Sequence, residues 1–163
     1  MTVTIGIDPG LNGAIAALRD GHKLIYLADM PTITEKVNGK DRKYISAVGV
    51  RQALVDIIDL CPGEHISVCL EHVSSSPQMG VTSAFNFGHG LGVIEGVVLC
   101  KRMMLHRVRP AIWKKKMKFS ADKEHIRAEM LRLFPGVELH LKRHADRAEA
   151  MALAIYEYKE HYE

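Results

Sequence analysis

The start of the chain alternates apolar and polar positions in a way that is typical of β-strands. In residues 3–8 (VTIGID), Val and Ile alternate with Thr, Gly and Asp, and Pro9-Gly10 predicts a turn after them. Residues 14–18 predict a second strand, Asp20-Gly21 is a two-residue hairpin signal, and residues 23–30 predict a third strand. These patterns together predict a three-strand antiparallel meander.

The rest of the chain alternates helical and strand patterns. Residues 48–60 have apolar side chains at helical spacing, and residues 66–71 (ISVCLE) are apolar up to a final acid, as in a parallel strand covered on both faces. The polar stretch 32–43 is predicted to be a loop. Further predicted elements are a helix over about 82–103, a strand over 105–108, a helix from Ser120 to about 134, and a helix from 143 or 144 to 158. This order predicts an α/β protein with a mixed five-stranded sheet, part antiparallel meander and part parallel, flanked by helices.

Length and composition indicate one ordinary folded domain over residues 1–163. The chain is 47% hydrophobic and 25% charged, which is typical of globular proteins and not of disordered ones. No basic segment followed by an apolar core predicts a secretory peptide, and we expect no apolar run to approach the roughly 20 residues of a membrane helix. Cys61, Cys69 and Cys100 lie in apolar surroundings without CxxC spacing, so we expect buried free thiols in a reducing cytoplasm.

The net charge of +3 hides an uneven distribution of basic residues. Between Gly96 and Ala121 there is no acidic residue, but this segment holds 8 of the 22 Lys and Arg residues. Such a block suits a polyanion, whose phosphates it would neutralise; a solvated basic surface explains the charge equally well. The candidate phosphate contacts are Arg107, Arg109, Lys114, Lys115, Lys116 and Lys118.

Four acidic residues form the candidate chemical site. Asp8 and Glu71 each end a predicted strand, where functional groups of α/β sheets gather. Asp146 and Glu149 are three residues apart, so they share one face of the last predicted helix. Taken singly, each acid has a structural explanation, as a turn former or as a residue favoured in the first turn of a helix. Together they would repel one another without a cation, and oxygen ligands suit Mg²⁺ or Mn²⁺.

Three segments that carry these acids resemble the RuvC-type Holliday junction resolvases of the RNase H-like (retroviral integrase) superfamily. They are residues 5–13 (IGIDPGLNG), 68–73 (VCLEHV) and 144–156 (HADRAEAMALAIY), and two further helices, over 85–98 and 120–131, are similar as well. The resemblance covers nearly the whole chain in order. It implies an RNase H-like fold and a structure-selective endodeoxyribonuclease for DNA recombination and repair. It also implies branched DNA as substrate, a homodimer without a membrane partner, and a cytoplasmic location in a bacterial cell or phage-infected host.

The resemblance also implies roles for the acids and for two lysines. It implies two Mg²⁺ ions per site, with Mn²⁺ as a substitute, and hydrolysis that leaves a 5′-phosphate. Asp8 would bridge both ions, Glu71 would share one with it, and Asp146 with Glu149 would hold the other. Two residues match family lysines: Lys114 would face the scissile phosphate, and Lys123 would be a second phosphate contact.

The sequence departs from the family pattern at two places. Glu149 stands where the family has Asp, and Ser74 stands where cellular relatives have an aromatic residue that wedges into the junction. Met79 is the one sizeable apolar residue near Ser74. These departures favour a broader cutter of branched DNA, as phage-encoded relatives tend to be. Trp113 is predicted to be a core anchor, with stacking on a base as the alternative.

Two other functions fit parts of the sequence. A non-catalytic module that binds branched DNA would have the same fold, but the presence of all four acids argues against it. An actin-like ATPase lobe also begins with a GIDPG-like strand, but it would need a second lobe for which 163 residues leave no room. The glycine-rich segment 85–98 is the candidate dimer interface.

Overall fold

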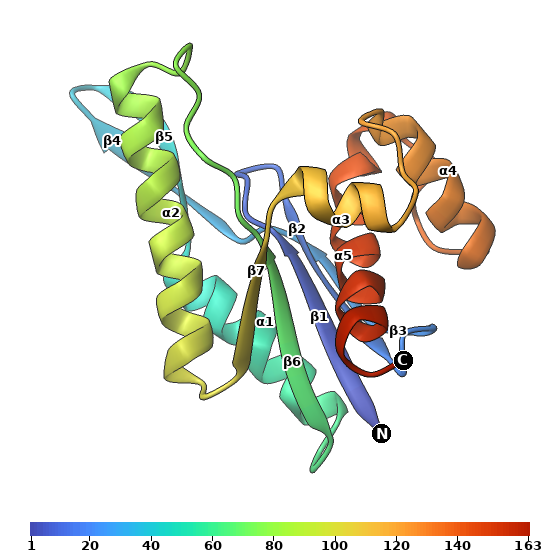
Figure 1. Cartoon of the computed structure of the whole chain (residues 1–163). Coiled ribbons are helices and arrows are strands. Elements are labelled where there is room, and N and C mark those ends of the chain that lie inside the picture. The colour runs from blue at the N-terminus through green and yellow to red at the C-terminus, as the bar shows by residue number, and fades with distance from the viewer.

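A five-stranded mixed sheet forms the centre of the protein (Figure 1). The computed structural model describes residues 1–163. The strand order is β3-β2-β1-β6-β7; β1 to β3 form the predicted antiparallel meander, and β6 and β7 continue parallel to β1. The predicted mixed sheet is therefore confirmed. The strands are β1 (Thr2–Asp8), β2 (Ala14–Arg19), β3 (Lys23–Asp29), β6 (His65–Glu71) and β7 (Met104–Val108).

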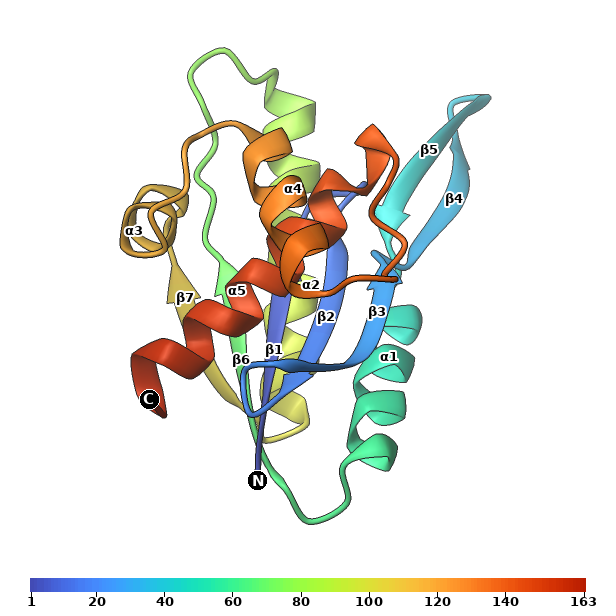
Figure 2. The same ribbon diagram turned by 90° about the vertical axis from the view of Figure 1, so that its right-hand side faces the viewer.

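Helices cover both faces of this sheet (Figure 2). Strand β1 alternates as predicted: Ile5 and Ile7 pack with α1 and α2, whereas Gly6 and Asp8 face α5 on the other side. Both faces of β1 are buried, so its polar positions mark the approach of a helix and not of solvent. The helices are α1 (Ala47–Leu60), α2 (Val81–Cys100), α3 (Pro110–Lys116), α4 (Lys123–Leu133) and α5 (Ala145–His161), with a 3₁₀ turn, η1 (Lys142–His144), before α5.

A hairpin of two strands and one short helix were not predicted from the sequence. The stretch predicted to be a loop forms a hairpin of β4 (Thr32–Val37) and β5 (Lys40–Ile45), which pair only with each other. Its strands are mostly exposed on both sides, so they carry no apolar alternation that would reveal them. The short helix α3 lies in the lysine-rich segment and was missed because seven residues give no clear periodicity.

Helix α2 corrects one expectation about apolar runs. It has 20 residues and a mean hydropathy of 1.2 over its most apolar window, so by length and composition alone it could cross a membrane. One such helix is weak evidence for a membrane span, and α2 packs on the sheet through Ile94 and Val98. Its other side leaves Phe85 and Leu99 exposed. The cysteines are free, as expected, but Cys100, the last residue of α2, is exposed and not buried.

Candidate metal centre and active site

The four predicted acids converge at the carboxyl ends of the central parallel strands. Because β1 and β6 are parallel neighbours, Asp8 and Glu71 emerge at the same edge. The N-terminal turns of α5 bring Asp146 and Glu149 to Asp8, and carboxylate oxygens of these three residues lie within 4.8 Å of one another. Glu71 stands outside this closest group, since its Oε1 accepts a hydrogen bond of 2.9 Å from the Trp113 indole.

Two glycines allow this convergence. A Cβ atom at Gly6 would lie 2.0 Å from the backbone oxygen of Ala150, so only glycine lets α5 cross β1 at this distance. A Cβ atom at Gly13 would lie 2.1 Å from the backbone oxygen of Asp8, so the turn after β1 also requires glycine. The Thr4 hydroxyl then holds the helix by donating a 2.8 Å hydrogen bond to the backbone oxygen of Ala154. The glycine and threonine of β1 thus place the two helical acids against Asp8.

Burial and mutual repulsion make the charged forms of these carboxylates unfavourable. Burial, followed by the charges of Glu71, Asp146 and Glu149, raises the pKa of Asp8 to about 7. Burial also raises the pKa of Glu71, and the hydrogen bond from Trp113 partly offsets this rise. A divalent cation among these oxygens would relieve both the burial cost and the mutual repulsion. Buried carboxylate oxygens are the ligands that Mg²⁺ and Mn²⁺ prefer, so the residues present fit such an ion.

Two lysines reach into the same cluster. The Lys114 ammonium lies 2.6 Å from Glu149 Oε1. The Lys123 ammonium lies 2.5 Å from Asp146 Oδ1 and 2.6 Å from Glu149 Oε2. Partial burial alone would lower the pKa of Lys123, but its contacts with the two carboxylates raise it above the usual value. Both predicted lysines therefore lie at the acids, where a phosphate group bound beside the carboxylates would meet them.

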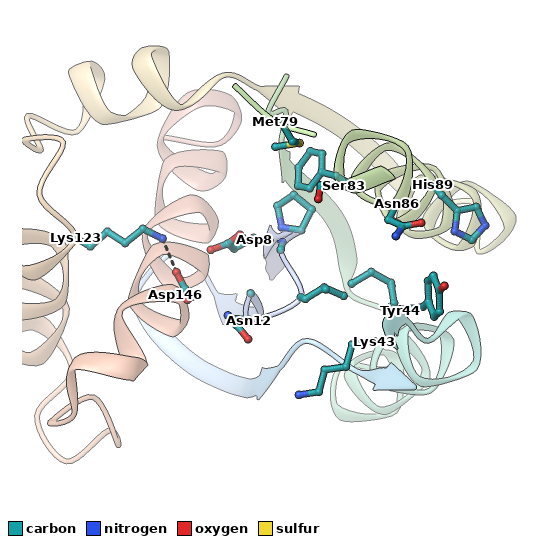
Figure 3. Close-up of a pocket in the computed structure, with 17 residues that line it drawn as sticks. Asp8, Asn12, Lys43, Tyr44, Met79, Ser83, Asn86, His89, Lys123 and Asp146 are labelled. Atoms are coloured by element: carbon teal, nitrogen blue, oxygen red, sulfur yellow. Dashed lines mark hydrogen bonds and ion pairs between the residues drawn. The ribbon is translucent and has the colours of Figure 1, made fainter. Parts of the chain in front are cut away.

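A pocket of about 480 Å³ opens beside the acids (Figure 3). Figure 3 shows Asp8 on one side with Lys123 and Asp146, and Lys43 and Tyr44 of β5 across the pocket. Other lining residues from α2, the β1–β2 turn and the segment before α2 include Ser83, Asn86, His89, Asn12 and Met79. Lys43 and Tyr44 were missed from the sequence because the hairpin that carries them was taken for a loop.

The remaining basic candidates differ in their surroundings. Arg109, Lys115 and Lys118 are exposed. The Arg107 guanidinium forms an ion pair of 2.5 Å with Glu95 of α2, and Lys116 forms an ion pair with Glu160 of α5. All five stay predicted phosphate contacts. Exposed ion pairs of this kind contribute about 0–1 kcal/mol, so a phosphate can replace the carboxylate partner at little cost.

Trp113 is fully buried, which confirms the core reading and excludes base stacking. Its contact with Glu71 was not predicted, because the two residues are 42 positions apart and no spacing rule links them. The indole packs in the core next to Phe119 and presents its N–H to the carboxylate. Trp113 is therefore both a core side chain and the group that orients Glu71.

Comparison with known proteins establishes the fold. No protein-family model matches this sequence, and no curated protein matches it. Among solved structures, RuvC of T. thermophilus in complex with a Holliday junction substrate matches with a TM-score of 0.65 and 16% identity, covering 96% of this chain and 92% of that chain. A Thermus thermophilus RuvC structure matches with a TM-score of 0.57 and 15% identity, covering 94% and 92%. The chain therefore has the RNase H-like fold of RuvC, over nearly the full length of both proteins.

Proposed function

We propose that this protein is a divalent-metal-dependent endonuclease that cleaves branched DNA, with four-way junctions as its main substrate. The observation that carries the proposal is the meeting of Asp8, Asp146 and Glu149 beside Lys114 and Lys123 on a RuvC-like fold. A module that only binds DNA has no need of buried carboxylates with a raised pKa. The RuvC-like fold, which covers 96% of this chain, also favours a nuclease over an actin-like ATPase lobe.

The four acids would hold two Mg²⁺ ions, which supply an activated water and stabilise the charge on the leaving oxygen. The chain's own residues do the rest. Trp113 fixes the carboxylate of Glu71, and α5 holds Asp146 and Glu149 against Asp8. The exposed Arg109, Lys115 and Lys118 extend positive charge from the site, where they would contact phosphates and not read bases.

We also propose that the protein acts as a homodimer through α2. The outward side of this helix exposes Phe85 and Leu99, and glycines recur at 88, 92 and 96, so a second helix can approach closely. A two-fold dimer suits a four-way junction, because two sites would then face two symmetric strands. Ser74 in place of an aromatic wedge favours a broad substrate range among branched DNAs. Such an enzyme would act in the cytoplasm of a bacterial or phage-infected cell, and we propose a phage-encoded origin.

The proposal is tested with an end-labelled four-way junction, fork, flap and linear duplex of matched sequence, each incubated with Mg²⁺ or with a chelator. We expect paired nicks with ligatable ends in the junction, none with chelator, and little cutting of the linear duplex. Junctions that stay intact with Mg²⁺ at catalytic protein concentrations would leave a DNA-binding module as the better description. Nicks on one strand only would contradict the symmetric dimer.

Lys114→Ala should lower the cleavage rate more than junction affinity. Its ammonium lies inside the acid cluster, only 16% exposed, where it would meet the scissile phosphate in the transition state. We expect a loss of about tenfold to a thousandfold in rate, by analogy with other removed charge-stabilising donors. Lys115→Ala is the matched control: it is exposed on the same helix and should lower affinity and cleavage together, by little. Equal losses of rate and affinity in Lys114→Ala would make Lys114 an ordinary phosphate contact.

Trp113→Phe should weaken Mg²⁺ binding while keeping an aromatic side chain in the core. Phenylalanine is aromatic but has no N–H to donate to Glu71, and loss of a group that orients a metal ligand typically costs about 10–100-fold in metal affinity or activity. The measurement is the Mg²⁺ concentration for half-maximal cleavage, which should rise, with partial recovery of rate at high Mg²⁺. A variant with lower thermal stability but an unchanged Mg²⁺ midpoint would show that Trp113 is a packing residue only.

A further inference from the structure

A second cluster of ligating side chains lies at the far end of α5. His106 of β7 and Glu157 and His161 of α5 bring one ligand atom each within 4.8 Å of one another. Glu157 lies eight residues beyond Glu149 on the same helix, about 12 Å along its axis. Figure 2 shows this C-terminal end of α5 on the β7 side of the sheet, and Asp146 and Glu149 lie in the N-terminal turns at the other end of the helix. None of the three residues takes part in the proposed nuclease chemistry.

The Glu157 carboxylate is only half satisfied. Its side chain is 0% exposed, and Oε1 lies 2.6 Å from Nδ1 of His106. Oε2 is buried and has no hydrogen-bond partner, and the nearest cationic candidate is Nε2 of His161 at 3.7 Å, too far for a hydrogen bond. A fully buried carboxylate oxygen without a partner costs free energy, so it calls for a ligand that the chain does not provide.

The two histidines are placed to share such a ligand. Their rings stack with centroids 4.0 Å apart and an interplanar angle of 21°. A neutral imidazole ring can offer a nitrogen lone pair to a shared ligand. Their side chains are 33% and 35% exposed, so an ion can reach them from solvent although Glu157 itself is buried.

We propose that His106, Glu157 and His161 form a binding site for a borderline transition-metal ion, with Zn²⁺ as the best fit. Two imidazole nitrogens and one carboxylate oxygen are a common zinc ligand set, and they differ from the all-oxygen set of the acidic site. In a tetrahedral zinc site neighbouring ligand atoms are roughly 3.3 Å apart, given bonds of about 2.0–2.2 Å. The observed spread of up to 4.8 Å therefore closes with small side-chain rotations. For His106 to coordinate through Nδ1, its ring proton must lie on Nε2, so coordination of the ion would replace the hydrogen bond between His106 Nδ1 and Glu157 Oε1.

The bound ion would connect the last helix, α5, to the edge strand β7. β7 is an edge strand in the sheet order, and the C-terminal end of α5 follows the turns that carry Asp146 and Glu149. Coordination by residues of both elements would fix that end of α5 to β7. This role is separate from the nuclease reaction, so the zinc proposal does not depend on the proposed function.

The test uses the full chain, stripped of metal with a chelator and dialysed into buffer with excess Mg²⁺ to saturate the carboxylate site. Zn²⁺ is titrated by calorimetry, Co²⁺ is added as a spectroscopic probe, and the Tm is measured with and without Zn²⁺. We expect one Zn²⁺ equivalent per chain, ligand-field absorption typical of four-coordinate Co²⁺, and a Tm gain of about 5–10 °C at a hundredfold excess over Kd.

Variants locate the bound ion. His106→Gln and His161→Gln should each weaken Zn²⁺ binding by about tenfold or more and remove the Tm gain. His65→Gln is the matched control, an exposed histidine that contacts Tyr162 and lies outside the cluster, and it should bind as wild type does. Asp8→Asn should still bind the one Zn²⁺ equivalent that depends on the two histidines. Absence of Zn²⁺ binding, binding unchanged in both histidine variants, or binding that depends on Asp8 instead would each overturn the proposal.

Discussion

Asp8→Asn should reduce Mg²⁺-dependent cleavage of a four-way junction by about a hundredfold to a thousandfold, with little change in junction binding. A metal-held charge contributes several kcal/mol to transition-state stabilisation, which corresponds to a rate effect of that size. Asp8 is the acid nearest the centre of the cluster: the charges of all three others act on it. Asparagine keeps the shape of the side chain but removes the anionic ligand.

The measurement is single-turnover cleavage alongside junction binding in chelator. Asp59→Asn serves as the control, because Asp59 is an exposed acid on α1, a helix that covers the opposite face of the sheet. Its cleavage rate should equal that of wild type. If Asp8→Asn cuts as fast as wild type, the metal assignment is wrong even where the nuclease activity survives.

The stability of Asp8→Asn separates a chemical effect from unfolding. The folded-state pKa of Asp8 is raised from 3.8 to about 7, so its contribution to stability is fully present below about pH 4 and is lost as the pH rises to about 7. Above that range, and without divalent ions, the wild-type chain carries a buried charge that asparagine lacks. Metal-free Asp8→Asn at pH 8 should therefore be more stable than wild type by about 1–2 kcal/mol. The gain is smaller than the full pKa shift implies, because water and nearby lysines offset part of the cost of burying the charge.

The sequence predicts the two strand-end acids well because their placement follows from local pattern. Asp8 and Glu71 each end an apolar run, and the parallel pairing of β1 with β6 brings such ends together. The hairpin β4–β5 could not be predicted in this way, because its strands are mostly exposed on both faces and so show no apolar alternation. The same limit hid Lys43 and Tyr44, which the hairpin brings to the pocket.

Contacts between distant segments were also beyond the sequence pattern. The hydrogen bond from Trp113 to Glu71 and the approach of His106 to Glu157 join residues 42 and 51 positions apart. Periodicity predicts which face of a helix or strand is buried, but it does not predict which side chains of other elements contact that face. Glu149 illustrates the reverse case: it departs from the family pattern by one methylene, but it is buried and lies within the closest carboxylate group with Asp8 and Asp146.

Gly6→Ala should be the most destabilising small substitution at the site. A Cβ atom at position 6 would lie 2.0 Å from the backbone oxygen of Ala150 and 2.5 Å from the backbone nitrogen of Ala154. Both contacts are to the backbone of α5, so no side chain can turn away and the helix itself must move. Overpacking of this kind costs about 3 kcal/mol or more, which lowers the Tm by roughly 6–12 °C in a protein of this size.

Gly80→Ala is the matched control for thermal unfolding. Gly80 precedes α2 with φ −60°, and a Cβ atom there meets nothing within 4 Å, so the change should cost about 1 kcal/mol at most. A Tm for Gly6→Ala equal to that of Gly80→Ala would show that α5 does not rest on β1 as closely as described.

The same substitution should impair catalysis even where the protein remains folded. Ala150 follows Glu149 directly, so a shift of α5 away from β1 moves Asp146 and Glu149 away from Asp8. A misplacement of about 1 Å can cost on the order of a hundredfold in rate. Cleavage by Gly6→Ala, measured well below its Tm, should therefore stay far below wild type, and raising the Mg²⁺ concentration should restore part of it. Full activity at low temperature would mean that the acids keep their positions without the close crossing of α5 over β1.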